Sequence, residues 1–131
     1  MKLKMICTVL WLVGVVMTGR APAAAPTVKL MGWFACSKCT AARVANGDIH
    51  PSNPVCAKEC IDNGDDAVFL NEQGKESLKI RKYAGATEDL GYHVEVTGVV
   101  DAAAKTITIE SVKRLSYEEA SCARPRPAKS K

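Results

Sequence analysis

Apolar and polar residues alternate along much of the chain after residue 26, and this period of two is the pattern of half-buried β-strands. The first alternating run extends from Thr27 to Cys36. Two short runs, 67–70 and 78–81, flank a polar turn that contains a glycine, and together they predict a β-hairpin. Two longer runs, 94–100 and 106–115, lie on either side of a second turn. We therefore expect five strands.

The last of these runs contains a slip in phase. Ile107 and Ile109 alternate with polar residues, but Val112 and Leu115 are out of phase with them. One extra residue in one strand of a pair produces such a slip. The sequence therefore predicts a β-bulge near Ser111.

Two short helices are expected between the first and second strands. The first has Ser37 as its N-cap and closes at 46–47, an Asn-Gly pair. The second has a fuller signature, with Asn53 as N-cap, Pro54 at the first helical position and Gly64 just past the end. Both helices would lie in a cysteine-bearing insertion between the two strands.

A third helical turn is expected at 87–91, between the third and fourth strands. The order of strand, helical insertion, two strands, short helix and two strands matches the OB-fold. We therefore predict one mainly β domain over residues 24–117. It would be a small five-stranded OB-fold-like barrel with a cysteine-bearing helical insertion after the first strand.

Residues 1–23 have the order of a secretory signal peptide. Lys2 and Lys4 precede a run at 5–17 that has no charged residue, and small residues follow, with cleavage expected after Ala23. The apolar run is shorter than the roughly 20 residues that span a bilayer. We expect a periplasmic or secreted protein with no stable membrane span after cleavage.

Basic charge is concentrated at the two ends of the chain. The chain has 18 basic and 14 acidic residues, but three of the basic residues lie in the predicted signal peptide and four lie after residue 123. The segment 118–131 is rich in proline and basic residues and is expected to be a disordered tail. Because the body between the ends carries more acidic than basic residues, nucleic acid is not expected as a partner.

Four cysteines carry the candidate chemistry: Cys36, Cys39, Cys56 and Cys60, spaced C-x2-C-x16-C-x3-C. Export favours structural disulfides, because exported compartments are oxidising. Cys56 and Cys60 would share one helix face, with Cys36 and Cys39 as their partners, and the connectivity stays open. Cys122 makes the cysteine number of the mature chain odd, so one cysteine is free, joined between chains or a ligand.

The same four cysteines support a second interpretation, as ligands of a zinc or copper ion. His50, in the loop between the two helices, could replace one of them. A third interpretation is thiol–disulfide exchange at Cys36 and Cys39, where a helix N-terminus and Lys38 would lower the pKa of a thiol.

Five segments carry a resemblance to known proteins: Gly32-Trp33, the C-x3-C segment 56–61, the apolar run 67–70, and the strands 94–100 and 105–113. They resemble a group of small exported bacterial proteins of unknown function that have a periplasmic OB-fold-like domain. Members of that group typically have one cysteine after the first strand and a C-x3-C pair, so the additional cysteine here is an elaboration. The resemblance implies export and an OB-fold-like domain, and it implies no activity.

The sequence contains no glycine-rich phosphate loop, no G-x-S-x-G and no H-E-x-x-H. His93 has no partner motif and is expected at a surface or strand edge. Trp33, Tyr83 and Tyr92 could form a stacking platform for a ligand. We therefore expect a binding module rather than an enzyme, with an unknown small ligand or an envelope protein as its partner. No cofactor is expected unless the four cysteines hold zinc or copper.

Overall fold

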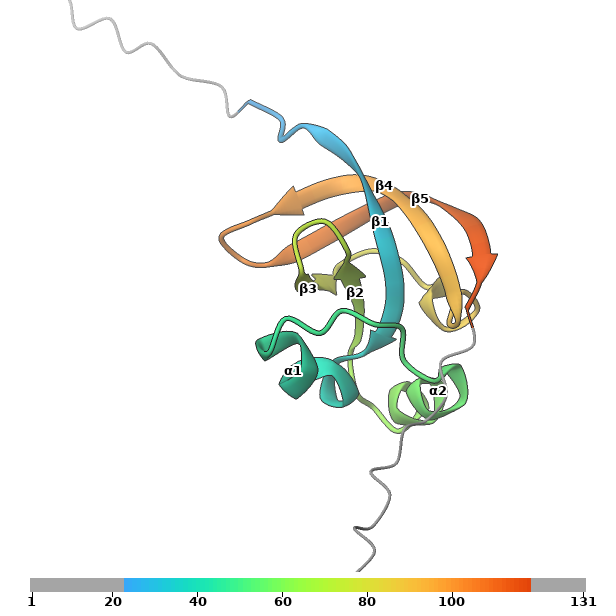
Figure 1. The fold of residues 1–131 in the computed structure, drawn as a ribbon. Coiled ribbons are helices and arrows are strands. Elements are labelled where there is room, and N and C mark those ends of the chain that lie inside the picture. Colours follow the sequence, from blue (N-terminus) through green and yellow to red (C-terminus); the bar gives the residue numbers. More distant parts are fainter. Residues whose placement is uncertain (1–22, 119–131) are drawn as a thin grey trace, which may run out of the picture.

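The computed structural model describes residues 23–118, so most of the predicted signal peptide, most of the predicted tail and Cys122 lie outside the described residues. The described chain forms five strands, two α-helices and one turn of 3-10 helix (Figure 1). In chain order these elements are β1 (Thr27–Cys36), α1 (Ser37–Ala45), α2 (Pro54–Asp62), β2 (Ala67–Asn71), β3 (Glu76–Ile80), η1 (Gly85–Thr87), β4 (Tyr92–Asp101) and β5 (Thr106–Tyr117). The mainly β class and the two helices after the first strand are confirmed.

The five strands form one sheet that closes in a ring, in the order β1-β2-β3-β5-β4. Neighbouring strands are antiparallel except β3 and β5, which run parallel where Lys79 pairs with Thr106 and Ile80 pairs with Ile107. The strand β1 is antiparallel to both of its neighbours, β2 and β4. Each strand therefore has a partner on both sides, which removes the open edges of the sheet.

A glycine lies where β1 passes from one neighbour to the other. Gly32 pairs with Val94 of β4 and also with Asn71 of β2. A Cβ atom added to Gly32 would lie 1.8 Å from the carbonyl oxygen of Leu70. The close approach of β2 to β1 at this point therefore requires a residue without a side chain.

The bulge that the sequence predicts in the last strand is confirmed. Thr97 pairs with Ser111, but the next residue, Gly98, pairs with Ile109, which leaves Glu110 as the extra residue of β5. The shift turns Val112 back toward the core, against which it packs. A second register shift near the end of β5 gives this long strand a further irregularity.

Two apolar clusters stabilise the domain. The larger cluster fills the ring with residues from all five strands and from α2, including Phe34, Phe69, Leu78, Val94, Ile107 and Ala57. The smaller cluster lies under α1 and the loop that follows it, and consists of Trp33, Ala35, Ile49, Val68 and Leu70, with Val44 packed against it. The two helices lie together where β1 ends (Figure 1), and the last five residues of β1 are buried.

The helix signals of the sequence agree with the structure at α2 and differ by one residue at α1. The Asn53 side chain accepts hydrogen bonds from the backbone N–H groups of Val55 and Cys56, and Pro54 is the first helical residue. At α1 the N-cap is Cys36, without a side-chain hydrogen bond, and the predicted cap Ser37 is already helical. The predicted cap is wrong because the helix begins directly at the end of the strand, where β1 fixes the backbone of the cap residue.

The connection between β3 and β4 is anchored by a buried carboxylate. The Asp89 side chain accepts hydrogen bonds from the Tyr83 hydroxyl and from Arg114 Nε, the latter at 2.6 Å. Burial, followed by the hydrogen bond to Asp89, raises the pKa of Tyr83 to about 12. The 3-10 turn in this connection lies at 85–87 rather than at the predicted 87–91, because the Gly85 carbonyl accepts the backbone N–H groups of Glu88 and Asp89.

Within residues 23–118, no helix has the length and apolar character that crossing a membrane requires.

We predict that Gly32→Ala destabilises the domain by about 3 kcal/mol or more, because the new methyl group overlaps a backbone carbonyl that cannot move without breaking the sheet. The matched control is Gly47→Ala, where φ is +75° but an added Cβ meets nothing within 4 Å. Its expected cost is about 1 kcal/mol from backbone conformation alone. Urea unfolding followed by circular dichroism measures both, and equal losses would contradict the steric argument.

Candidate functional site

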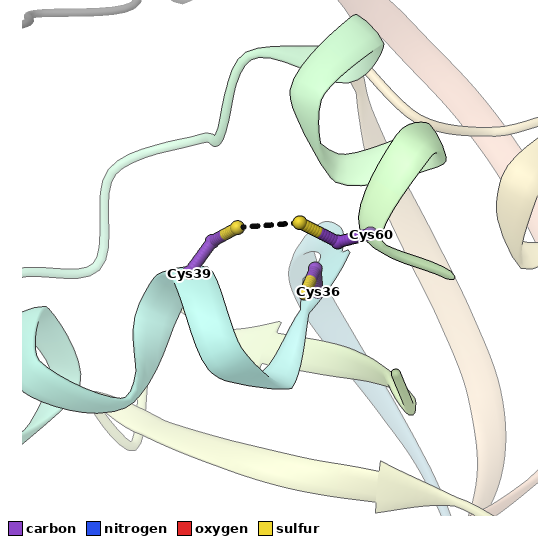
Figure 2. Close-up of side chains that lie close together, drawn as sticks. All are labelled: Cys36, Cys39 and Cys60. Atoms are coloured by element: carbon purple, nitrogen blue, oxygen red, sulfur yellow. Dashed lines mark hydrogen bonds between the residues drawn. The ribbon is translucent and has the colours of Figure 1, made fainter. Parts of the chain in front are cut away.

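Three of the four predicted site cysteines lie together at the end of the ring. Cys36 is the last residue of β1, Cys39 lies in the first turn of α1, and Cys60 lies in the last turn of α2. Their Sγ atoms are all within 4.8 Å of one another. The closest pair is Cys39 and Cys60, at 3.4 Å, and Figure 2 shows these two side chains pointing toward each other beside Cys36.

The first two thiols are brought together by a direct passage from strand to helix. Cys36 belongs to β1 and also acts as the N-cap of α1, so Cys39 follows it within one helical turn. The Thr40 hydroxyl donates hydrogen bonds to the carbonyl oxygens of Cys36, at 2.8 Å, and of Ser37, at 3.3 Å. The Ser37 N–H donates to the carbonyl oxygen of Asp66, at 2.9 Å. These bonds hold the strand–helix junction in place.

The third thiol is positioned by the packing of α2 on the ring. Cys60 and Ile61 lie three and four residues after Ala57, so all three face the same side of the helix. Ala57 belongs to the larger core cluster, and Cys60 and Ile61 pack against it. The helix face that covers the ring therefore also carries Cys60 to the other two sulfur atoms.

Cys56, which was expected to share the helix face of Cys60, does not join the three-sulfur cluster. Its side chain is exposed, whereas the cluster is formed by Cys36, Cys39 and Cys60. The reason is the rotation of α2 about its axis. Ala57 faces the core, and Cys56 precedes it by one residue, which is about 100° around the helix.

The three sulfur atoms of the cluster are thiols. A disulfide bond has a sulfur–sulfur distance of about 2.05 Å, and the closest pair here is at 3.4 Å. The predicted cross-bridges between Cys36 or Cys39 and the cysteines of α2 stay a prediction. Cys36 is buried, and its thiol donates a weak hydrogen bond to Asp65 Oδ2 at 3.9 Å.

Local burial keeps Cys39 protonated. Desolvation is the largest cause, followed by hydrogen bonds with Cys60 and Cys36, and together they raise the pKa of the Cys39 thiol from 9.0 to about 12. The residue as a whole is exposed, but its sulfur atom points inward toward Cys60 (Figure 2). The position at a helix N-terminus beside Lys38 predicted a lowered thiol pKa, and for Cys39 the direction is the opposite.

The distances in the cluster suit a shared metal ion. Thiolate ligands lie about 2.3 Å from zinc, so two thiolates on one ion are about 3.8 Å apart in tetrahedral geometry and about 4.0 Å apart in trigonal geometry. All three sulfur–sulfur distances here are within 4.8 Å. Side-chain shifts of less than about 1 Å would bring them to the distances of a tetrahedral or trigonal site. Three sulfur ligands from three elements are therefore nearly in place for a soft cation.

The two histidines lie away from this cluster. His50, the predicted substitute ligand, is exposed, and its Nε2 lies 3.8 Å from Asp48 Oδ1. His93 is half-buried and has one side-chain partner in β1 and another directly after β2. Its ring stacks on Trp33 with centroids 4.7 Å apart, and its Nε2 lies 3.0 Å from Glu72 Oε2. The pairing of His93 in β4 with Trp33 in β1 creates this contact, and this strand register could not be predicted from the sequence.

The aromatic residues do not form one stacking platform. Trp33 belongs to the smaller core cluster, and its buried Nε1 has no hydrogen-bond partner among residues 23–118. Tyr83 stacks on Phe34, which lies in the larger cluster. Tyr92 contacts Tyr117 edge to face. Trp33 therefore lies apart from Tyr83 and Tyr92, which both pack against the larger cluster.

Comparison with known proteins gives no relative for this chain. No protein-family model matches it, and searches of curated proteins and of solved structures found no match.

We predict that the reduced, metal-free protein loses stability as the pH rises above about 9, in part through Cys39. The pKa of Cys39 is higher in the folded state than the ordinary value of 9.0. Its contribution to the free energy of unfolding is therefore complete below pH 9.0 and is lost as the pH rises to about 12. The measurement is urea unfolding at about pH 8 and about pH 10.5. Tyr83 titrates in the same direction, so the test is the difference between wild type and Cys39→Ser. Identical pH dependence in the two proteins would contradict the assignment.

Proposed function

We propose that this chain is an exported, non-enzymatic protein of the cell envelope, in which an OB-fold-like domain holds a soft metal ion at Cys36, Cys39 and Cys60. The observation that carries the metal proposal is the convergence of three sulfur atoms from three different elements, all within 4.8 Å. A disulfide would account for two of these atoms, whereas one shared soft cation would account for all three.

The connectivity of the ring supports the OB-fold-like part of the proposal. An OB-fold is a five-stranded, partly open Greek-key barrel, and here five strands close in the order β1-β2-β3-β5-β4. The insertion α1–α2 comes between β1 and β2, and α2 packs against the core of the ring through Ala57. In this proposal the insertion is an elaboration that both covers the ring and builds the thiol site.

Copper(I) is the ion that we propose first. Soft thiolate ligands favour Cu(I) and zinc over harder cations, and a three-coordinate Cu(I) ion needs no ligand beyond these three sulfur atoms. A zinc site would need a fourth ligand, because structural zinc is almost always four-coordinate. Asp65 lies next to Cys36 and would act as a neighbouring carboxylate rather than as one of the three convergent donors.

A disulfide between Cys39 and Cys60 is the second candidate, and the 3.4 Å approach of their sulfur atoms favours it. Such a bond would tie α1 to α2 and leave Cys36 as a buried thiol beside it. In that case the domain would be a disulfide-stabilised binding module, for a small ligand or an envelope protein. The oxidising environment of an exported protein supports this alternative.

A catalytic thiol has little support. A reactive cysteine needs a lowered pKa, and the pKa of Cys39 is raised. A thiol–disulfide exchange function is therefore not proposed for Cys39.

The export proposal predicts a mature protein that begins at Ala24. Cleavage after Ala23 would leave β1, which starts at Thr27, complete. The full chain is expressed in a bacterium with a periplasm, and the intact mass of the periplasmic protein is measured. Retention of the first 23 residues, or recovery only from the cytosol, would contradict the proposal.

The metal proposal predicts one Cu(I) ion bound per reduced chain. Cys36→Ser, Cys39→Ser and Cys60→Ser should each lower the affinity by more than about 100-fold, because loss of a ligand exceeds the 10–100-fold cost of losing an outer-sphere partner. The affinity is measured by anaerobic competition with a chromophoric Cu(I) chelator, and zinc is tested in parallel.

Cys56→Ser is the matched control for this titration. It removes a thiol from the same helix, one turn from Cys60, and should leave the affinity unchanged because Cys56 lies outside the cluster. Equal losses for Cys56→Ser and Cys60→Ser would refute the three-sulfur site. If wild type binds neither ion and Cys39 is found bonded to Cys60, the disulfide alternative replaces the metal proposal.

A further inference from the structure

A groove lies between α1 and the turns of the two hairpins of the ring. Its volume is about 480 Å³, within the range of about 300–1,000 Å³ that is usual for sites of small organic molecules. The helix α1 contacts β3 on this side of the ring. The groove is lined by residues of α1, of the two turns and of the start of β3: Ser37, Ala41, Val44, Ala45, Lys75, Glu76, Ser77 and Lys105.

The helix wall of the groove is mostly apolar. Ser37, Ala41 and Ala45 follow one another at intervals of four residues, so they share one face of α1, and this face is about 12 Å long. Ala41 and Ala45 are exposed, and Val44 beside them is half-buried. Cys39 is two residues from Ser37, or about 200° around the helix. The groove and the thiol cluster therefore lie on different sides of α1.

The two lysines occupy equivalent positions in two turns of equal length. The turn 72–75 joins β2 to β3 and ends at Lys75, and the turn 102–105 joins β4 to β5 and ends at Lys105. Their φ angles are +49° and +51°, and among residues 23–118 they are the only non-glycine residues with a positive φ. Glycine adopts this conformation at the lowest cost. Turn geometry therefore does not explain lysine at either position, and such residues are frequent at ligand sites.

Strand pairing brings both lysines to the same groove. The parallel neighbours β3 and β5 begin directly after Lys75 and Lys105. The backbone N–H of Lys79 donates a hydrogen bond to the carbonyl oxygen of Lys105, at 2.9 Å, and Lys75 lies four residues before Lys79, about 13 Å of strand. Each lysine has a flexible four-carbon stem, so both ammonium groups can approach one anion. Lys79 itself is paired with Asp66 Oδ2 at 2.8 Å.

The groove has an excess of one positive charge. Among the residues that the structure describes, neither Lys75 nor Lys105 has an ion-pair partner. Glu76 is the acidic residue of the lining, and its Oε1 accepts a hydrogen bond from Asn71 Nδ2 at 3.4 Å. Two ammonium groups and one carboxylate leave a net charge that a monoanion would neutralise.

We propose that this groove binds a small organic carboxylate. The carboxylate of the ligand lies between Lys75 and Lys105, and a short alkyl portion lies along Ala41, Val44 and Ala45. The lysines supply the attraction for a single negative charge, and the helix wall offers no charged side chain to a polar substituent. This site goes beyond the metal proposal and does not depend on it.

The site is tested with octanoate as the probe. The full chain, kept reduced and free of metal, is titrated by isothermal calorimetry and by NMR. We expect saturable binding of one octanoate per chain, with shifts of the amide signals of 37–45, 75–77 and 105. Acetate, which lacks the alkyl portion, should bind at least about ten-fold more weakly. Octan-1-ol, which lacks the charge, should bind at least about three-fold more weakly.

Charge variants test the two lysines. Lys75→Gln and Lys105→Gln should each lower the affinity for octanoate about two- to five-fold, the usual effect of removing one exposed ion pair. The double variant Lys75→Glu/Lys105→Glu should abolish saturable binding. Lys113→Gln is the matched control, because Lys113 is an exposed lysine of β5 outside the groove, and it should leave the affinity unchanged.

Glycine variants separate ligand binding from folding. Lys75→Gly and Lys105→Gly should keep or raise the Tm, because glycine adopts a positive φ without steric cost, and they should weaken octanoate binding as much as the glutamine variants do. A lower Tm with unchanged affinity would show that the lysines serve the turns and would overturn the proposal.

Three further outcomes would overturn it. They are no saturable binding of octanoate to wild type, equal binding of octanoate and either control compound, and equal losses for Lys113→Gln and Lys75→Gln. None of them bears on the affinity for Cu(I), which is measured without carboxylate, so the two proposals fail separately.

Discussion

The position of β1 between two neighbours is the constraint on which the rest of the domain depends. The strand pairs with β4 along its first part and with β2 along its last part, and the two ladders overlap at Gly32 and Trp33. The overlap is possible because Gly32 has no side chain where the Leu70 carbonyl approaches. Beyond this point β1 is buried to its last residue, Cys36. The pairing of β1 with its neighbours therefore fixes the backbone of Cys36, which carries one of the three sulfur atoms, without any contribution from the helices.

Local signals predicted much of this fold. Period-two alternation predicted the strands, and the Asn53-Pro54 pair predicted the start of α2. The change of phase in the apolar alternation after Ile109 predicted the β-bulge. These features depend on residues that are close in the chain. The cap of α1 and the partners of His93 depend instead on strand ends and cross-strand register. The membership of the thiol cluster depends on how α2 is rotated on the ring, which the spacing of Cys56 and Cys60 could not fix.

The electrostatics of the cluster favour neutral thiols when no cation is bound. Cys39 resists ionisation because its sulfur is desolvated and adjoins two other thiols. Placing several negative charges there without compensation would be costly, since desolvation and like charges both disfavour the thiolate. A bound soft cation reverses that balance by stabilising the thiolates directly. A site that is protonated alone and anionic with metal binds more tightly as the pH rises, which a purely structural thiol would not do.

The short helix α2 separates two kinds of cysteine by the direction in which each faces. Ala57 and Ile61 hold one side against the ring, and this side carries Cys60 into the cluster. Cys56 is one turn away but is exposed. Because the rotation of the helix is set by apolar packing, the two thiols cannot exchange places without unpacking Ala57. The apolar packing of α2 on the ring therefore decides that Cys60, and not Cys56, joins Cys36 and Cys39.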